Sequence, residues 1–244
     1  MNLHFEVKGI GKPVIFLHSG AMDSRDWQFI APQIAEKSFQ VITLDLRGAG
    51  KSPVPTEPID YVKDLRSIYD QLDMKEAVLV GHSLGGQIAT DFTLAYPNKV
   101  SKLILIAPGL SGYQFSSEYR ALERRASSAI PDVEKMIDIT LSESSWRIPK
   151  GPTNQLLRQI MRDNILFTWG THEVVSYSAI ERLHEIDVST LLLIGDNESD
   201  DLFQIAERYK AVPDIRVVHI TNANHIMTLT HPEEISKNIT DFLN

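Results

Sequence analysis

The chain contains several short apolar runs that alternate with segments of helical periodicity. Four of the runs are PVIFLH, QVITLDL, AVLV and LILIA, which begin at Pro13, Gln40, Ala77 and Leu103. Short continuous apolar runs are typical of strands that are buried on both faces, as in a parallel sheet. Residues 60–72 lie between two of the runs and carry apolar side chains at helical spacing. This alternation predicts right-handed βαβ units, and therefore an α/β fold with a mostly parallel central sheet and helices on both faces.

The alternation stops between residues 112 and 186 and then resumes. That stretch has no strongly β-branched apolar run, and prolines separate its helical segments. After it come the apolar run TLLLIG and a last strand and helix. We therefore expect residues 1–111 and 187–244 to form one core domain, with residues 112–186 inserted as a helical cap.

Charge and composition narrow the possible partners. The net charge is −8, whereas nucleic acids and anionic membranes are bound by clustered Lys and Arg. The chain has no cysteine, which excludes disulfides, cysteine-based metal sites and a thiol nucleophile. No apolar run approaches the ~20 residues of a membrane span, and the N-terminus is too polar for a signal peptide. We expect a cytoplasmic monomer or homodimer that acts on a small molecule without a cofactor or metal.

The sequence GHSLG, residues 81–85, lies directly between a predicted strand and a predicted helix. Glycines two residues either side of Ser83 leave room for the strained backbone of a sharp strand-to-helix turn. Such a turn exposes the serine hydroxyl beside the first amides of the helix, which can stabilise an anion. A glycine turn that only packs the helix is one alternative. A phosphate-binding loop is another, but its Gly-Lys-Ser/Thr ending is missing. The pattern favours a nucleophilic serine.

A nucleophilic serine needs a base. Of the eight histidines, His225 stands in a polar loop between a predicted strand and the last predicted helix. His219 lies inside that strand, and His82, although next to the serine, is expected to point away from it. His225 is therefore the expected base.

The base needs an orienting acid, which is expected in DNESDD, residues 196–201, directly after TLLLIG. Glu198, Asp196 and Asp200 are all candidates. An acidic first turn of a helix is an alternative interpretation of this segment. A calcium loop is another, but it lacks the glycine required at its sixth position.

Five segments, in order, resemble the α/β-hydrolase family. They are FLHSG at 16–20, LDLRGAGKS at 44–52, VGHSLGG at 80–86, LLLIGDNE at 191–198 and ANHIMTLTHPEEI at 223–235. The order of serine, acid and histidine is also that of the family. The resemblance covers nearly the whole chain and implies an α/β-hydrolase fold with a helical cap and a serine esterase or lactonase activity.

The resemblance also implies a catalytic triad of Ser83, Glu198 and His225. The family usually has Asp three residues after the glycine that ends the strand, and this chain has Glu198 there. The backbone amides of Gly20 and Leu84 would form the oxyanion hole. No residue is expected to bind a cofactor or a metal.

Two further positions depart from the family pattern. His18-Ser19 stands where the family has His-Gly, which could stiffen the oxyanion loop. Asn224 replaces a glycine before the histidine, and Asn tolerates a left-handed backbone better than most residues. We expect His18, Ser19, Trp146 and Trp169 to line the substrate pocket.

The sequence constrains the identity of the substrate less than it constrains the fold, because one fold supports many chemistries. No cluster of Arg or Lys demands an anionic substrate, so a small or medium apolar carboxylic ester or lactone is expected, cleaved through an acyl-enzyme. A carbon–carbon bond hydrolase or a cofactor-free perhydrolase with the same site is an alternative. A ligand-binding or regulatory protein of the same fold with little turnover is another. Turnover of simple esters and analysis of the products separate these hypotheses.

Overall fold

A seven-stranded sheet, in the order β1-β3-β2-β4-β5-β6-β7, forms the centre of the molecule. The structure, a computed structural model, describes residues 3–168 and 173–244. The strands are β1 (Phe5–Lys8), β2 (Lys12–Leu17), β3 (Phe39–Leu44), β4 (Ala77–His82), β5 (Val100–Ile106), β6 (Thr190–Gly195) and β7 (Ile215–Ile220). β1 pairs antiparallel with β3, and the other neighbouring strands pair parallel. Every residue of β4 and β6 is buried, which explains their unbroken apolar character. The predicted α/β sheet is confirmed.

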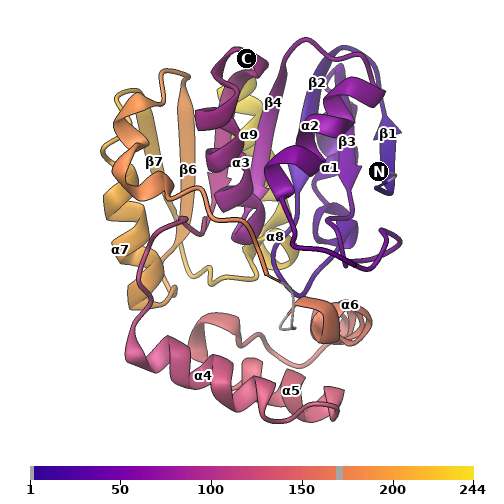
Figure 1. The fold of residues 1–244 in the computed structure, drawn as a ribbon, viewed down its shortest axis with the longest axis vertical. Coiled ribbons are helices and arrows are strands. Elements are labelled where there is room, and N and C mark those ends of the chain that lie inside the picture. Colours follow the sequence, from indigo (N-terminus) through magenta and orange to yellow (C-terminus); the bar gives the residue numbers. More distant parts are fainter. Residues whose placement is uncertain (1–2, 169–172) are drawn as a thin grey trace.

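Helices cover both faces of this sheet. They are α1 (Ala31–Ala35), α2 (Tyr61–Gln71), α3 (Leu84–Ala95), α7 (Asp200–Tyr209), α8 (Met227–Thr230) and α9 (Pro232–Leu243). In Figure 1, α3 lies in front of the sheet and α9 behind it, while α2 packs on α3 and α1 contacts α9. Within the described residues, no helix is long and apolar enough to cross a membrane.

Three helices gather at one end of the sheet, below it in Figure 1. They are α4 (Ser117–Ser127), α5 (Val133–Thr140) and α6 (Pro152–Thr168), and α5 contacts both of the others. Residues 3–168 and 173–244 also contain the 3-10 helices η1 (Ser24–Trp27), η2 (Pro97–Lys99), η3 (Ser144–Trp146), η4 (Ala179–Glu181) and η5 (Leu183–Glu185). The boundaries of the expected cap, residues 112–186, stay a prediction.

A second apolar cluster, separate from the main core, includes residues of α5 and α6. Its fully buried members include Met136 of α5 and Ile160 of α6. Met22, in the loop after β2, and Ile226, next to His225, belong to the same cluster. These buried side chains pack α5 and α6 against the loop after β2 and the loop of His225, both of which the sequence predicts to lie at the active site.

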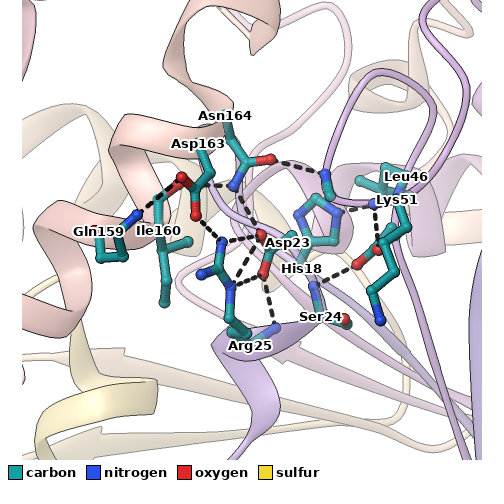
Figure 2. Close-up of polar contacts among 12 residues, drawn as sticks. His18, Asp23, Ser24, Arg25, Leu46, Lys51, Gln159, Ile160, Asp163 and Asn164 are labelled. Carbon is teal, nitrogen blue, oxygen red and sulfur yellow. Dashed lines mark hydrogen bonds and ion pairs between the residues drawn. The ribbon is translucent and has the colours of Figure 1, made fainter. Parts of the chain in front are cut away.

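Polar contacts fasten α6 to the same end of the sheet (Figure 2). Arg25 donates to the carboxylate of Asp23 and pairs with Asp163 of α6, with Nη2 and Oδ2 2.8 Å apart. Asn164 Nδ2 donates to Asp23 Oδ2 at 2.8 Å, and its Oδ1 accepts the backbone N–H of Gly50 at 2.8 Å. One buried side chain of α6 thus binds two separate loops.

Candidate active site

Ser83 stands on the sharp turn between β4 and α3. Its backbone has φ 52° and ψ −112°, a conformation that is strained for a residue with a side chain. A Cβ atom on Gly81 would lie 2.3 Å from the carbonyl oxygen of Gly85, and one on Gly85 would lie 2.0 Å from that of Leu17. Both glycines are therefore required by close backbone contacts, as the sequence pattern predicted.

His225 and Glu198 form a buried pair near this turn. His225 Nδ1 lies 3.1 Å from Glu198 Oε1. A carboxylate accepts hydrogen bonds, so a neutral imidazole in this contact donates from Nδ1 and keeps a lone pair on Nε2. Ser83, Glu198 and His225 all line one cavity of about 620 Å³. Three residues from three distant parts of the chain thus meet at the same cavity.

The two other candidate acids lie apart from His225. The side chain of Asp196 is 44% exposed, and its Oδ1 faces His219 Nδ1 at 3.5 Å. Asp200 is exposed at the start of α7. The geometry favours Glu198 as the partner of His225.

A second histidine–carboxylate pair lies behind the site. His82 Nδ1 is 2.8 Å from Asp26 Oδ2, and His82 Nε2 is 2.9 Å from the carbonyl oxygen of His225. Both partners are acceptors, so His82 donates from both nitrogens and is an imidazolium. Burial alone would lower the pKa of His82, but the charge of Asp26 raises it above its ordinary value. His82 is buried, is not among the residues that line the cavity, and contacts the backbone of His225.

Asp26 connects this pair to two more segments. Its Oδ2 accepts the backbone N–H of Ser19 at 3.0 Å, and its Oδ1 accepts the hydroxyl of Thr228 at 2.6 Å. Burial would raise the pKa of Asp26, but His82 and these donors lower it. Sequence reasoning missed Asp26, because its partners Ser19, His82 and Thr228 lie 7, 56 and 202 residues away. No local pattern marks it.

His18 stabilises the loop that contains Gly20. Burial lowers the pKa of His18, so the ring is neutral. Its Nε2 accepts the backbone N–H of Leu46 at 2.9 Å (Figure 2), and its Nδ1 donates to the carbonyl oxygen of Ser19 at 2.7 Å. His18, Gly20 and Leu84 line a second, smaller hollow. The amides of Gly20 and Leu84 stay predicted oxyanion donors.

The residues expected to line the pocket divide into three groups. Trp146 lines the 620 Å³ cavity, and its ring centroid is 4.9 Å from that of His225. His18 and Ser19 are buried and are not among the residues that line this cavity. Trp169 lies outside the described residues.

Tolerance of a left-handed backbone was the predicted reason for Asn224 in place of glycine, and the structure does not support this reason. Asn224 is not among the residues with positive φ, whereas Asn222 is, with φ 60°. Asn224 Nδ2 donates instead to the carbonyl oxygen of Arg147 at 2.8 Å. The backbone N–H of His225 donates to the carbonyl oxygen of Ser145 at 2.9 Å. The histidine loop is therefore bound to the segment around η3.

Metal binding would need several ligating side chains close together. Among the residues that the structure describes, no group of three or more His, Asp and Glu side chains has such an arrangement.

A family model described as alpha/beta hydrolase fold matches residues 12–232. This match spans most of the 244 residues, so the chain belongs to the α/β-hydrolase fold family.

Two named relatives match the chain over most of its length. The chain is 26% identical over 257 residues to a pimeloyl-[acyl-carrier protein] methyl ester esterase of Legionella pneumophila (strain Lens), and the match covers 100% of both chains. It is 26% identical over 249 residues, 94% of this chain and 89% of the relative, to a Bacillus subtilis (strain 168) protein described as a candidate 2-succinyl-6-hydroxy-2,4-cyclohexadiene-1-carboxylate synthase. The solved structure of MenH from S. aureus superposes with a TM-score of 0.85 at 20% identity, covering 98% of this chain and 97% of that one. At that identity the superposition supports the fold alone.

Proposed function

We propose that this protein is a serine hydrolase that cleaves a small or medium carboxylic ester or lactone through an acyl-enzyme. The observation that carries the proposal is the 3.1 Å contact between His225 Nδ1 and Glu198 Oε1, on the cavity that Ser83 also lines. A weak hydroxyl nucleophile becomes effective when a base takes its proton and an acid orients that base.

In the first half of the reaction, Ser83 Oγ attacks the ester carbonyl carbon while His225 Nε2 takes the hydroxyl proton. Glu198 accepts the Nδ1–H hydrogen bond and stabilises the imidazolium. The backbone amides of Gly20 and Leu84 donate to the oxyanion of the tetrahedral intermediate. The carbon–oxygen bond to the alcohol then breaks, and the alcohol takes the proton from His225.

In the second half, water replaces the alcohol. His225 takes a proton from the water, whose oxygen attacks the acyl carbon of the ester formed with Ser83. The second tetrahedral intermediate collapses, the carboxylic acid leaves, and Ser83 recovers its proton from His225. No cofactor or metal is needed for either half.

One of the two named relatives supports ester chemistry, whereas the other is named as a synthase. The Legionella relative is named for the hydrolysis of a methyl ester and matches this chain over its full length. The Bacillus relative is named for a product that bears a carboxylate. The described lining of the cavity in this chain has five carboxylates and one guanidinium, which disfavours a carboxylate-bearing compound.

Hydrolysis of p-nitrophenyl acetate, butyrate and octanoate tests the proposal. The wild type should turn over at least one of them, and Ser83→Ala and His225→Ala should lose about 10⁴-fold or more in kcat. Thermal melts show whether the variants stay folded. A wild type that is no faster than Ser83→Ala on all three esters would favour the ligand-binding hypothesis, and analysis of the products detects the other chemistries.

A further inference from the structure

The cavity that contains Ser83 has an excess of negative charge in its walls. Its lining carboxylates are Glu118, Glu143, Glu198, Asp200 and Asp201. Arg125 is the one Lys or Arg among the described lining residues. The whole chain has 32 acidic residues against 24 Lys and Arg, so the lining is far more acidic than the chain.

This charge is not cancelled by neighbouring side chains. Within residues 3–168 and 173–244, none of the five carboxylates forms an ion pair with Lys or Arg. Asp201 is held by neutral donors, which are the hydroxyl of Tyr113 at 2.9 Å and the N–H and hydroxyl of Ser116 at 3.0 and 2.7 Å. Neutral donors orient a carboxylate and leave its net charge in place. A concave site lined by one sign of charge concentrates ions of the other sign.

A second observation concerns Glu198. Its side chain is 0% exposed, and its Oε1 faces His225. Its Oε2 is buried without a hydrogen-bond partner among the described residues. An unpaired buried carboxylate oxygen is unfavourable, and a positive charge in the adjoining cavity would reduce this cost through space.

Aromatic rings lie among these carboxylates. Trp146 packs at 4.9 Å from the ring of His225, and Phe115 stacks on Tyr119 with centroids 4.2 Å apart. All three rings line the cavity. Aromatic faces attract cations through their quadrupole, and the attraction adds to that of nearby carboxylates.

We propose that this site prefers esters with a positively charged group, such as an ammonium in the alcohol part, over neutral esters of the same shape, and that it discriminates against carboxylate-bearing esters. The preference rests on the proposed hydrolysis for its catalytic test, but the recognition of a cation does not require turnover.

Three acetate esters test the preference with the same acyl group. They are acetylcholine, its neutral isostere 3,3-dimethylbutyl acetate, and 4-acetoxybutanoate. At about 20 mM NaCl we expect kcat/KM to fall about tenfold from the cation to the neutral ester and about tenfold again to the anion, with both ratios shrinking at about 500 mM NaCl. A cation-to-neutral ratio of one or less would overturn the proposal.

Matched variants locate the origin of the preference. Glu143→Gln with Asp200→Asn removes two wall charges and should reduce the cation-to-neutral ratio at least threefold. Glu233→Gln with Glu234→Gln is the control, because these acids lie in the first turn of α9, as Asp200 does in α7, but do not line the cavity. An equal ratio in the two double variants would overturn the proposal.

Binding to the Ser83→Ala variant separates this proposal from the proposed function. Titration calorimetry should show choline binding more tightly than 3,3-dimethylbutanol, with an affinity that weakens as salt rises. This result together with no turnover by the wild type would reject the hydrolase and keep the cation preference. Equal affinities would reject the cation preference, whatever the turnover.

Discussion

His82 and Asp26 form an ion pair that is closed to solvent, with Nδ1 and Oδ2 2.8 Å apart and both side chains 0% exposed. The pair joins two loops and helix α8, because it also contacts the backbone of His225 and Ser19 and the hydroxyl of Thr228. A buried ion pair is a weak source of stability compared with apolar packing, but removal of one partner is severe because a charge is left unpaired. We conclude that this pair positions the residues around Ser83.

Asp26→Asn should lower the free energy of unfolding by about 3–5 kcal/mol, because it leaves His82 buried without its counter-charge. Urea denaturation measures the change. Asp241→Asn, which alters an exposed ion pair, is the control and should change stability by less than ~1 kcal/mol. Similar small changes in both variants would contradict the structural role of Asp26.

The effect of Asp26→Asn should depend on pH. The pKa of His82 is raised from 6.5, so its contribution is complete below pH 6.5 and disappears as the pH rises through the folded-state value. The pKa of Asp26 is lowered from 3.8, so its contribution is complete above pH 3.8 and disappears as the pH falls through the folded-state value. The difference in unfolding free energy between wild type and variant should therefore be greatest between pH 3.8 and pH 6.5. A difference that does not vary with pH would contradict the charged pair.

Glu198→Gln should reduce kcat by about 10²–10⁴-fold, because an amide in its place disturbs the tautomer of His225. Asp196→Asn is the matched variant, since Asp196 comes two residues earlier and faces His219 instead. It should change ester turnover less than about twofold. A larger loss in Asp196→Asn than in Glu198→Gln would reassign the acid.

Asp91→Asn should stabilise the protein at neutral pH. Burial raises the pKa of Asp91, on α3, to about 6, and the hydroxyl of Ser111 donates to its Oδ1 at 2.5 Å. Because the folded state holds this proton more tightly than the unfolded state, its stability falls as the pH rises from 3.8 to about 6. Asn keeps the acceptor and removes the charge.

Thermal melts at about pH 4 and about pH 7.5 check this sign. The free energy of unfolding of Asp91→Asn, relative to that of the wild type, should be about 1–3 kcal/mol greater at the higher pH than at the lower pH. Glu76→Gln, at an exposed position before β4, should show no such gain. A loss of stability in Asp91→Asn at the higher pH would contradict a raised pKa.

Asn164→Ala should loosen α6 from the rest of the molecule. Its side chain bonds to Asp23 and to the N–H of Gly50, so its removal should lower the free energy of unfolding by about 1–3 kcal/mol. Limited proteolysis should also cut residues 112–186 faster. Gln159→Ala, at an exposed position of the same helix, is the control. Equal cleavage rates in the two variants would show that Asn164 does not fasten α6.

The sequence predicts the parts of this molecule that depend on local patterns. β4 and β6 are buried along their whole length, so an unbroken apolar run reveals them. The turn at Ser83 needs glycine at 81 and 85 for close backbone contacts, and this requirement is local as well. His225 was predicted from its polar loop between a predicted strand and the last predicted helix, and Glu198 was predicted because a known family places an acid at that position.

The contacts that sequence reasoning missed join residues far apart in the chain. Asp26 accepts a hydrogen bond from Thr228, 202 residues away in the sequence, and Asn164 donates one to Asp23, 141 residues away. Neither residue has a distinctive spacing, because the fold alone brings the partners together. Asn224 shows the same limit of local reasoning, since its side chain bonds to Arg147 instead of allowing a left-handed backbone.

Covalent labelling by a fluorophosphonate, followed by peptide mass spectrometry, tests the role of Ser83 most directly. The probe phosphonylates a serine only when a base activates it, so the wild type should be modified at Ser83, and Ser83→Ala and His225→Ala should remain unmodified. A folded wild type that stays unmodified, or an adduct on another residue, would contradict the assignment of Ser83 as the nucleophile.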